Sequence, residues 1–194
     1  MSHRFTLGCN GSFRRLRPFS DFRLSELCAL YVLCVRFLVL VCAVTPTQQL
    51  ATFLRKYDPK IAAFARSVLT RMRKRFPGAT ELVYDNYNAL VVGFGPTDRA
   101  SEAIFSVVLY PRWIILYFLQ GAQLPDPDRL LKGSGTVGRH IRLETIATLD
   151  DPKVQLLINT ALHRAKVPLD PTARRRLIIK SISAKQRPRR PSRP

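Results

Sequence analysis

A short polar cluster, "YDNYN" at residues 84–88, interrupts an apolar stretch of the chain. It brings two phenols, a carboxylate and an amide close together in Tyr84, Asp85, Tyr87 and Asn88. Because asparagine tolerates the backbone of a tight turn, the cluster predicts a hairpin turn. Its phenol, carboxylate and amide groups can line a ligand pocket. Alternatively, the tyrosines pack as half-buried aromatics and Asp85 caps the turn.

A glycine-rich stretch, "GSGTVG" at residues 133–138, matches the pattern G-x-G-x-x-G. The dinucleotide fingerprint needs a strand before this pattern and a helix after it. Here an irregular piece precedes the glycines and a strand is expected after them, which excludes a Rossmann site. The loop amides, together with Lys132, Arg139 and Arg142, can form a nest for an anion. The alternative is a flexible loop with solvated charges beside it.

The segment "RHIRLE" at residues 139–144 is predicted to be a strand, whose side chains alternate between two faces. One face then carries Arg139, Ile141 and Leu143, and the other carries His140, Arg142 and Glu144. Like charge from the flanking arginines is expected to lower the pKa of His140, which leaves the ring neutral. Such a histidine can hydrogen-bond a ligand, or it can be an ordinary hydrogen-bonded residue of the sheet.

Catalytic and metal-binding patterns are scarce. The four cysteines, Cys9, Cys28, Cys34 and Cys42, all precede the expected core and have no C-x-x-C spacing, so no structural zinc site or core disulfide is predicted. The sequence has no G-x-S-x-G and no H-E-x-x-H pattern. Carboxylate pairs at 126 and 128 and at 150 and 151 lie in proline-flanked turns, where helix capping explains them. An enzyme is therefore the least supported class of function, and we predict no catalytic or metal-ligating residues.

Positive charge is concentrated at the C-terminal end of this 194-residue chain, whose net charge is +19. From residue 174 onward there are nine Lys and Arg residues and no acid. A short apolar "LII" can form an edge strand, and the rest is expected to be disordered. Such a tail can neutralise nucleic-acid phosphates, or it can simply be solvated. The residues for nucleic-acid contact would be Arg174, Arg175, Arg176, Lys180, Lys185, Arg187, Arg189 and Arg190.

An apolar stretch, "LCALYVLCVRFLVLVCAV", occupies residues 27–44 after a basic flank. It can be an export signal or a membrane anchor, although Arg36 disfavours a spanning helix. Alternatively, it is not part of the functional protein. We expect a cytoplasmic protein, with anchoring or export through residues 27–44 as the alternative; only a real anchor would give a membrane contact.

Helical periodicity begins after Pro46, where apolar residues recur at i, i+3, i+4 and i+7. Thr47 or its neighbour is expected to cap this helix. Asp58 followed by Pro59 then begins a second helix, because Asp accepts from free backbone N–H groups and Pro fits the first turn. The same Asp-Pro pair at residues 151–152 begins the last helix.

Between the second and last helices, five segments rich in Val, Ile, Phe and Tyr predict consecutive strands: "ELVYD", "ALVVGFG", "AIFSVVLY", "WIILYFL" and "RHIRLE". The expected fold class is α+β, with two N-terminal helices, a mostly antiparallel five-stranded sheet and one C-terminal helix. We predict an N-terminal extension at residues 1–45, an α+β domain at residues 46–166 and a basic, largely disordered tail at residues 167–194.

The segment from "KYDPKIAAFARSVLTRMRKRFPG" to "GRHIRLET", with the tail "RRRLIIKSISAKQRPRR", resembles the YdhG-like family, a widespread bacterial domain family. The likeness covers roughly residues 46–166, with the tail as a further part. It implies a compact α+β domain of the secretion-chaperone-like type, related in shape to YjbR-like proteins. Some members are described as frataxin-like iron chaperones, so the resemblance implies iron as a candidate cofactor. It implies no catalytic residues.

Two hypotheses about function follow. The first is a non-enzymatic binding protein of the YdhG-like kind, which holds a small anionic ligand or a metal-loaded partner between the 84–88 turn and the strand at 139–142. The second is a nucleic-acid-associated accessory protein that acts through the basic tail and the cationic end of the second helix.

Overall fold

The computed structural model describes residues 44–190. Residues 1–43 and 191–194 lie outside this part, and with them all four cysteines and the apolar stretch 27–44 except its last residue. The interpretations of that stretch as a signal, an anchor or a segment foreign to the functional protein therefore lie outside the described residues. Within residues 44–190, no helix combines the length and the apolarity needed to cross a bilayer.

Two helices come first, then strands, then one helix and a final strand. The α-helices are α2 (Pro46–Arg55), α3 (Pro59–Arg75) and α4 (Pro152–His163). The strands are β1 (Thr80–Asp85), β2 (Leu90–Gly95), β3 (Phe105–Leu109), β4 (Ile114–Phe118), β5 (Arg139–Leu143) and β6 (Arg176–Ile182). This content agrees with the predicted mixture of helices and sheet.

Each helix begins with an oxygen-bearing cap followed by proline. Asp58 and Asp151 accept from the backbone N–H two residues on, as their Asp-Pro pairs predicted. The cap of α2 is Thr45, whose hydroxyl accepts from Gln48 N in a reciprocal capping box. The predicted cap, Thr47 or its neighbour, was one or two residues too late, because Pro46 already occupies the first helical position.

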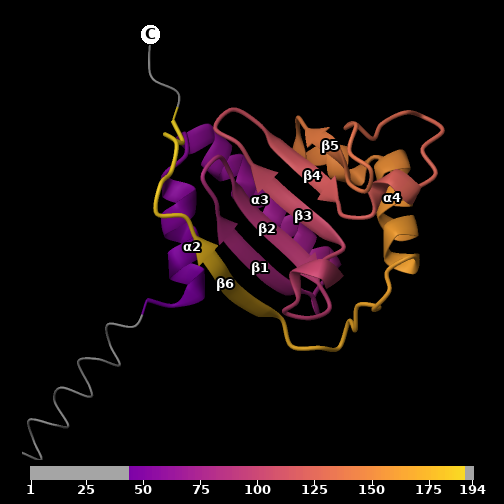
Figure 1. The fold of residues 1–194 in the computed structure, drawn as a ribbon, viewed down its shortest axis with the longest axis horizontal. Helices are drawn as coiled ribbons and strands as arrows, with labels where there is room; N and C mark the ends of the chain where they lie inside the picture. Colours follow the sequence, from indigo (N-terminus) through magenta and orange to yellow (C-terminus); the bar gives the residue numbers. More distant parts are fainter. Residues whose placement is uncertain (1–43, 191–194) are drawn as a thin grey trace, which may run out of the picture. The chain divides into compact units, whose positions relative to one another are not determined.

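The sheet is six-stranded and mixed, so the predicted five-stranded, mostly antiparallel sheet is wrong in strand number. Its order is β5-β4-β3-β2-β1-β6 (Figure 1), and only the pair of β1 with β6 is parallel. The sixth strand comes from the tail. Before it, the chain returns from α4 to the start of β1, where Asp170 lies against Gly78. A strand that begins there must run in the same direction as β1.

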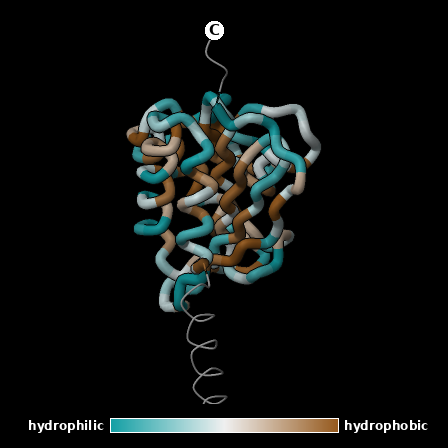
Figure 2. Tube along the Cα trace, turned by 90° about the vertical axis from the view of Figure 1, so that its left-hand side faces the viewer, coloured by the Kyte–Doolittle hydropathy of each residue, from teal (hydrophilic) through white to brown (hydrophobic). Residues whose placement is uncertain are grey.

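The helices cover one face of the sheet and leave the other open. In Figure 1, α3 passes behind the sheet, and no helix of residues 44–190 crosses in front of it. Alternate strand residues point toward the helices and form the core, among them Val83, Val92, Phe105, Leu116 and Ile141. Figure 2 shows the hydrophobic residues running through the middle of the fold and hydrophilic ones at its outer turns.

Two carboxylates of β1 also point to the helical side, and neither has exposed surface: Glu81 and Asp85. Arg73 of α3 donates to both oxygens of Glu81, at 2.8 and 2.6 Å. Asp85 accepts from Lys56 at 2.6 Å and from Arg189 at 3.1 Å. A buried carboxylate needs such partners, because its transfer from water is otherwise strongly unfavourable. Both therefore tie the strand to other elements.

The tail is ordered as far as Arg190, which differs from the predicted disorder. After β6, the backbone N–H groups of Ser183 and Arg187 donate to the carbonyls of Asp85 and Tyr87. Arg189 is only 4% exposed and lies over the ring of Tyr57 at 5.6 Å. Composition alone suggested disorder because the anchoring groups are arginines, whose acceptors lie far away in the sequence.

Replacement of Asp85 by asparagine is expected to destabilise the fold by roughly 3–5 kcal/mol, because it leaves Arg189 buried without its counter-charge. Urea denaturation would measure this loss. The control is Asp128→Asn, which breaks the solvent-exposed pair with Lys153 and should leave the midpoint almost unchanged. Equal midpoints for the two variants would show that the buried pair does not stabilise the protein.

Candidate functional site

The open face of the sheet carries a hollow of about 880 Å³. Its floor consists of the strand residues that alternate with those of the core, and most of them are apolar. Leu82, Val91, Val108 and Ile115 supply these apolar side chains from four adjacent strands. A sheet face of this composition is normally packed against a second layer, and here it lines an open cavity.

Two small residues, Gly93 and Ser106, belong to the lining of the hollow. Gly93 of β2 lies opposite Ser106 of β3. A Cβ atom at Gly93 would meet the Ser106 hydroxyl at 3.5 Å and the Cβ atoms of Ala103 and Leu82 at 3.7 Å, which is ordinary van der Waals contact. The glycine is therefore not required by close packing, and its missing side chain leaves free space over the floor.

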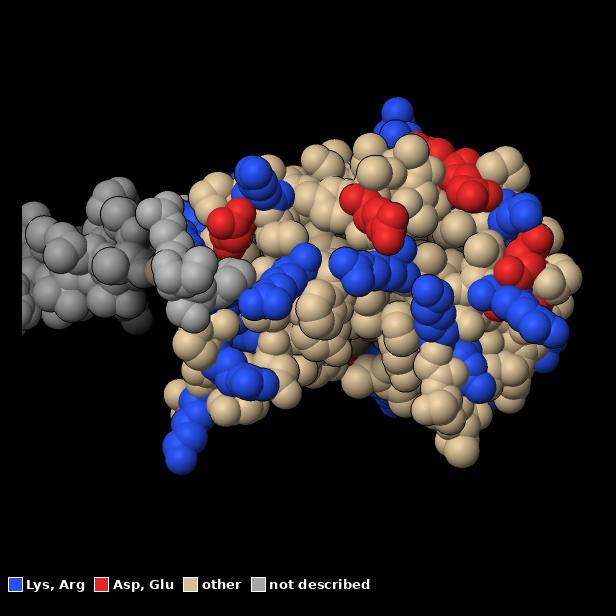
Figure 3. Space-filling model, turned by 90° about the horizontal axis from the view of Figure 1, so that it is seen from above, with Lys and Arg blue, Asp and Glu red and all other residues tan. Residues whose placement is uncertain are grey.

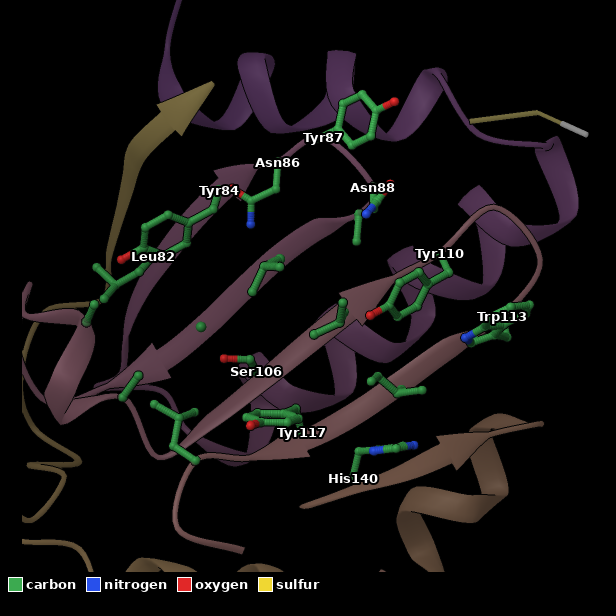
Figure 4. Close-up of a pocket in the computed structure, with 18 residues that line it drawn as sticks. Leu82, Tyr84, Asn86, Tyr87, Asn88, Ser106, Tyr110, Trp113, Tyr117 and His140 are labelled. Carbon is green, nitrogen blue, oxygen red and sulfur yellow. The ribbon is translucent and has the colours of Figure 1, made fainter. Parts of the chain in front are cut away.

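Aromatic side chains surround this space. Figure 4 shows Tyr84, Tyr87, Tyr110, Trp113 and Tyr117 placed around the open face, from β1 and its turn across to β4. Tyr87 and Trp113 are 50% and 38% exposed, so both present ring surface to solvent. The rings of Tyr110 and Trp113 lie 5.5 Å apart. Exposed aromatic surface of this kind favours contact with a ligand that has an apolar or aromatic body.

His140 of β5 closes the far side of the hollow and lies opposite Tyr117 in the sheet. Its pKa is lowered, mainly by burial and then by the charge of Lys132. The predicted direction of the pKa shift was therefore right, but the predicted cause was wrong, because the neighbouring arginines do not contribute to it. A neutral ring can accept or donate one hydrogen bond toward a ligand.

The structure brings four of the eight predicted ligand residues together. All four line the hollow on the same face of the sheet: Tyr84, Tyr87 and Asn88 at β1 and its turn, and His140 at β5. Asp85 does not, because it points to the helical side.

The remaining predicted cations lie outside the lining. Arg142 is at the rim, with its guanidinium 5.6 Å from the ring of Trp113. Arg139 donates to the carbonyls of Gly135 and Gly138, so it closes the glycine-rich loop on itself. Lys132 pairs with His140 through their backbones, as an isolated bridge. The strand β5 follows the loop directly, in agreement with the exclusion of a Rossmann site.

Sequence reasoning missed Gly93, Ser106, Tyr110, Trp113 and Tyr117. The signal was present in the period of the strands, since residues 106, 108 and 110 and residues 113, 115 and 117 alternate with core residues. The segments "AIFSVVLY" and "WIILYFL" were predicted only as strands rich in Val, Ile, Phe and Tyr, with no face assigned to their side chains. Their alternate positions, occupied by Ser, Tyr and Trp, mark a second face that is not part of the core.

The structure also bears on metal binding and on the predicted nucleic-acid residues. Within residues 44–190, no group of three His, Cys, Asp or Glu side chains is placed to hold a metal ion. In the tail, several of the proposed nucleic-acid residues have acceptors in the fold. Arg175 lies 3.8 Å from Glu81, Lys180 lies 3.7 Å from Asp98, and Arg189 binds Asp85.

Comparison of the chain with protein-family models, with curated proteins and with solved structures finds no match. A fold also does not define an activity by itself. The function is therefore argued from the hollow, its lining and the charges around it.

The lowered pKa of His140 predicts a pH-dependent stability. Because the folded protein disfavours the charged ring, the unfolded chain binds more protons once the pH falls below the ordinary value of 6.5. The wild type should therefore lose stability relative to His140→Gln as pH is lowered from about 7.5 to about 5, as measured by urea unfolding. The matched control, His163→Gln at an exposed position of α4, should keep the wild-type pH dependence. Identical pH profiles for wild type and His140→Gln would contradict this assignment.

Proposed function

We propose that this protein is a non-enzymatic binding protein whose open sheet face holds a small anionic ligand with an apolar or aromatic body. The observation that carries the proposal is the hollow of about 880 Å³, lined by aromatic and aliphatic side chains where a second packing layer would otherwise lie. Small-molecule sites commonly measure roughly 300–1,000 Å³ and combine an apolar lining with a few polar groups. We interpret the chain as a YdhG-like domain, but no ligand and no catalytic residue of this proposal is carried over from that family.

The charge around the hollow supports an anionic ligand. None of the 18 residues that line it, all within the described part of the chain, is an aspartate or glutamate. His140 is favoured in its neutral form, and Arg142 lies at the rim against Trp113. A cleft with low-dielectric walls and cations at its edge raises the local concentration of anions.

Binding is favoured over catalysis because the lining lacks an assembled nucleophile. Ser106 and His140 both line the hollow, but Tyr117 of β4 lies between them in the sheet, and no hydrogen bond joins them in residues 44–190. Nucleophilic catalysis by serine needs that contact. The polar groups present, which are phenols, amides and one imidazole, suit orientation of a ligand.

Filling the floor should abolish binding without unfolding the protein. Gly93→Val would project two methyl groups into the hollow, and a β-branched residue fits a strand. Anilinonaphthalene sulfonate, an aromatic anion, can serve as the probe, with energy transfer from Trp113 as the signal. We expect its affinity to fall by about tenfold or more in Gly93→Val.

The matched control is Ala63→Val, which adds the same kind of volume at an exposed position of α3 on the helical side. This variant should bind the probe as the wild type does. An unchanged affinity in Gly93→Val, with its unfolding midpoint also unchanged, would reject the hollow as the binding site.

A second candidate, nucleic-acid binding, is favoured by one observation. Arg174, Arg176, Lys185 and Arg187 are exposed and form no ion pair within residues 44–190. Removal of the whole tail would not test this hypothesis, because it would also remove β6 and the partner of Asp85. Charge substitutions avoid that problem.

Arg174→Gln combined with Lys185→Gln should weaken retention of a single-stranded oligonucleotide and lower its salt slope by about 1.4, since each phosphate contact contributes about 0.7. Filter retention across a salt series would measure both quantities. Lys60→Gln with Arg66→Gln, two exposed positions of α3, is the charge-matched control. No retention by the wild type at low salt would end this candidate.

A further inference from the structure

A second hollow, of about 510 Å³, adjoins the open sheet face. It lies where the tail passes the turn at residues 84–88. The two hollows share Asn88, Tyr110 and Trp113 as lining residues. The second one is otherwise lined by prolines and by three arginines: Arg112, Arg187 and Arg190. A single ligand can therefore contact the aromatic rim of the first hollow and the cations of the second.

These three arginines come from segments far apart in the sequence. Arg112 belongs to the turn between β3 and β4, whereas Arg187 and Arg190 belong to the tail. All three are exposed, and within residues 44–190 none of them has an acidic partner. Arg190 donates to the carbonyls of Tyr57 and Arg55, at 3.2 and 3.1 Å, which fixes its position. The fold thus gathers guanidinium groups that no carboxylate of the described chain neutralises.

The buried anchor of the tail holds this arrangement in place. The N–H of Arg187 donates to the carbonyl of Tyr87 at 3.0 Å, and Arg189 donates to Asp85 at 3.1 Å. The tail backbone that carries Arg187 and Arg190 is therefore attached to the end of β1 and to the turn that follows it. Because this backbone is already held, less of the chain must be ordered on binding, which favours affinity.

The buried carboxylate of Asp85 does not cancel the positive charge of the cations around it. Asp85 lies between Lys56 and Arg189, so one negative charge faces two positive ones. Two nitrogen atoms of Arg189, Nε and Nη1, have no hydrogen-bond partner in the described residues. Figure 3 views the molecule from above and shows Lys and Arg side chains spread over this side, with a hollow at its lower edge. The local potential is therefore positive.

We propose that the hollow at Arg112, Arg187 and Arg190 is the anion subsite of the binding protein, and that its ligand is an amphiphile with a carboxylate or phosphate head. The head would lie among the arginines, since guanidinium groups match the geometry of both anions. The apolar body would extend past Trp113 over the sheet. This inference rests on the proposed function, because it assigns the body of the ligand to the hollow on the open sheet face.

Paired probes can separate the two parts of the ligand. Decyl phosphate carries head and body, decanol carries the body with a neutral head, and inorganic phosphate carries the head alone. Trp113 is the only tryptophan of the chain and borders both hollows, so its fluorescence reports binding of each probe to the full chain. We expect the wild type to bind decyl phosphate at least about tenfold more tightly than decanol or phosphate.

The variant that tests the subsite is Arg112→Gln with Arg187→Gln, which leaves the anchoring side chains of Arg189 and Arg190 intact. It should weaken the binding of decyl phosphate by about tenfold or more, because each hydrogen bond lost to the charged head lowers the affinity. Its affinity for decanol should not change. The control is Arg174→Gln with Lys185→Gln, which removes the same charge elsewhere and should leave both affinities near wild type.

Three results would overturn the inference. One is an equal loss of affinity for decyl phosphate in the test and control variants, which would show that net charge alone explains the binding. Another is equal wild-type affinity for decanol and decyl phosphate, which would leave the apolar hollow and the proposed function standing without the anion subsite. The third is displacement of decyl phosphate by a single-stranded oligonucleotide at lower concentration, which would assign the arginines to nucleic acid. If neither decanol nor anilinonaphthalene sulfonate binds, the proposed function itself fails.

Discussion

The carboxylate of Asp85 lies at the end of β1 without exposed surface, between cations that come from opposite ends of the described chain. Lys56 ends α2, and Arg189 lies beyond the last strand. A buried carboxylate is tolerated only with such partners, and the requirement is mutual, because Arg189 is equally buried. This cluster therefore fixes where the tail runs. The tail in turn carries the arginines that border the aromatic rim, so the proposed ligand site depends on an ion pair outside its own lining.

The sheet meets two different environments because its side chains alternate. One set packs under α2, α3 and α4 and consists of large apolar residues and paired carboxylates. The other set includes tyrosines and the small residues Gly93 and Ser106, which line the hollow. A sheet with a single helical layer usually makes its second face polar toward water. Here that face is apolar at its floor and aromatic at its edge, which is the composition of a binding surface.

The local features of this fold were readable from the sequence, and the long-range ones were not. Helix starts at Asp58 and Asp151 and the first five strands follow from capping and β-propensity, which act between near neighbours. Strand β6 was underestimated because its apolar core is short and its stabilising partner, β1, lies about a hundred residues earlier. The hollow was half predicted: Tyr84 and His140 stood out as polar groups in apolar surroundings. Trp113 and Gly93 did not, because only the register between strands places them on the same face.

The parallel pairing of β6 with β1 has a consequence for how this protein is made. Strand β1 lies inside the finished sheet, yet its outer neighbour, β6, leaves the ribosome after every other strand of residues 44–190. Until then the nascent domain presents an unpaired strand edge, along with a carboxylate at Asp85 that lacks one of its cations. Unpaired edges are templates for association with other chains. The nascent protein therefore passes through a stage in which the free edge of β1 is open to association, and synthesis of the segment that contains β6 ends that stage.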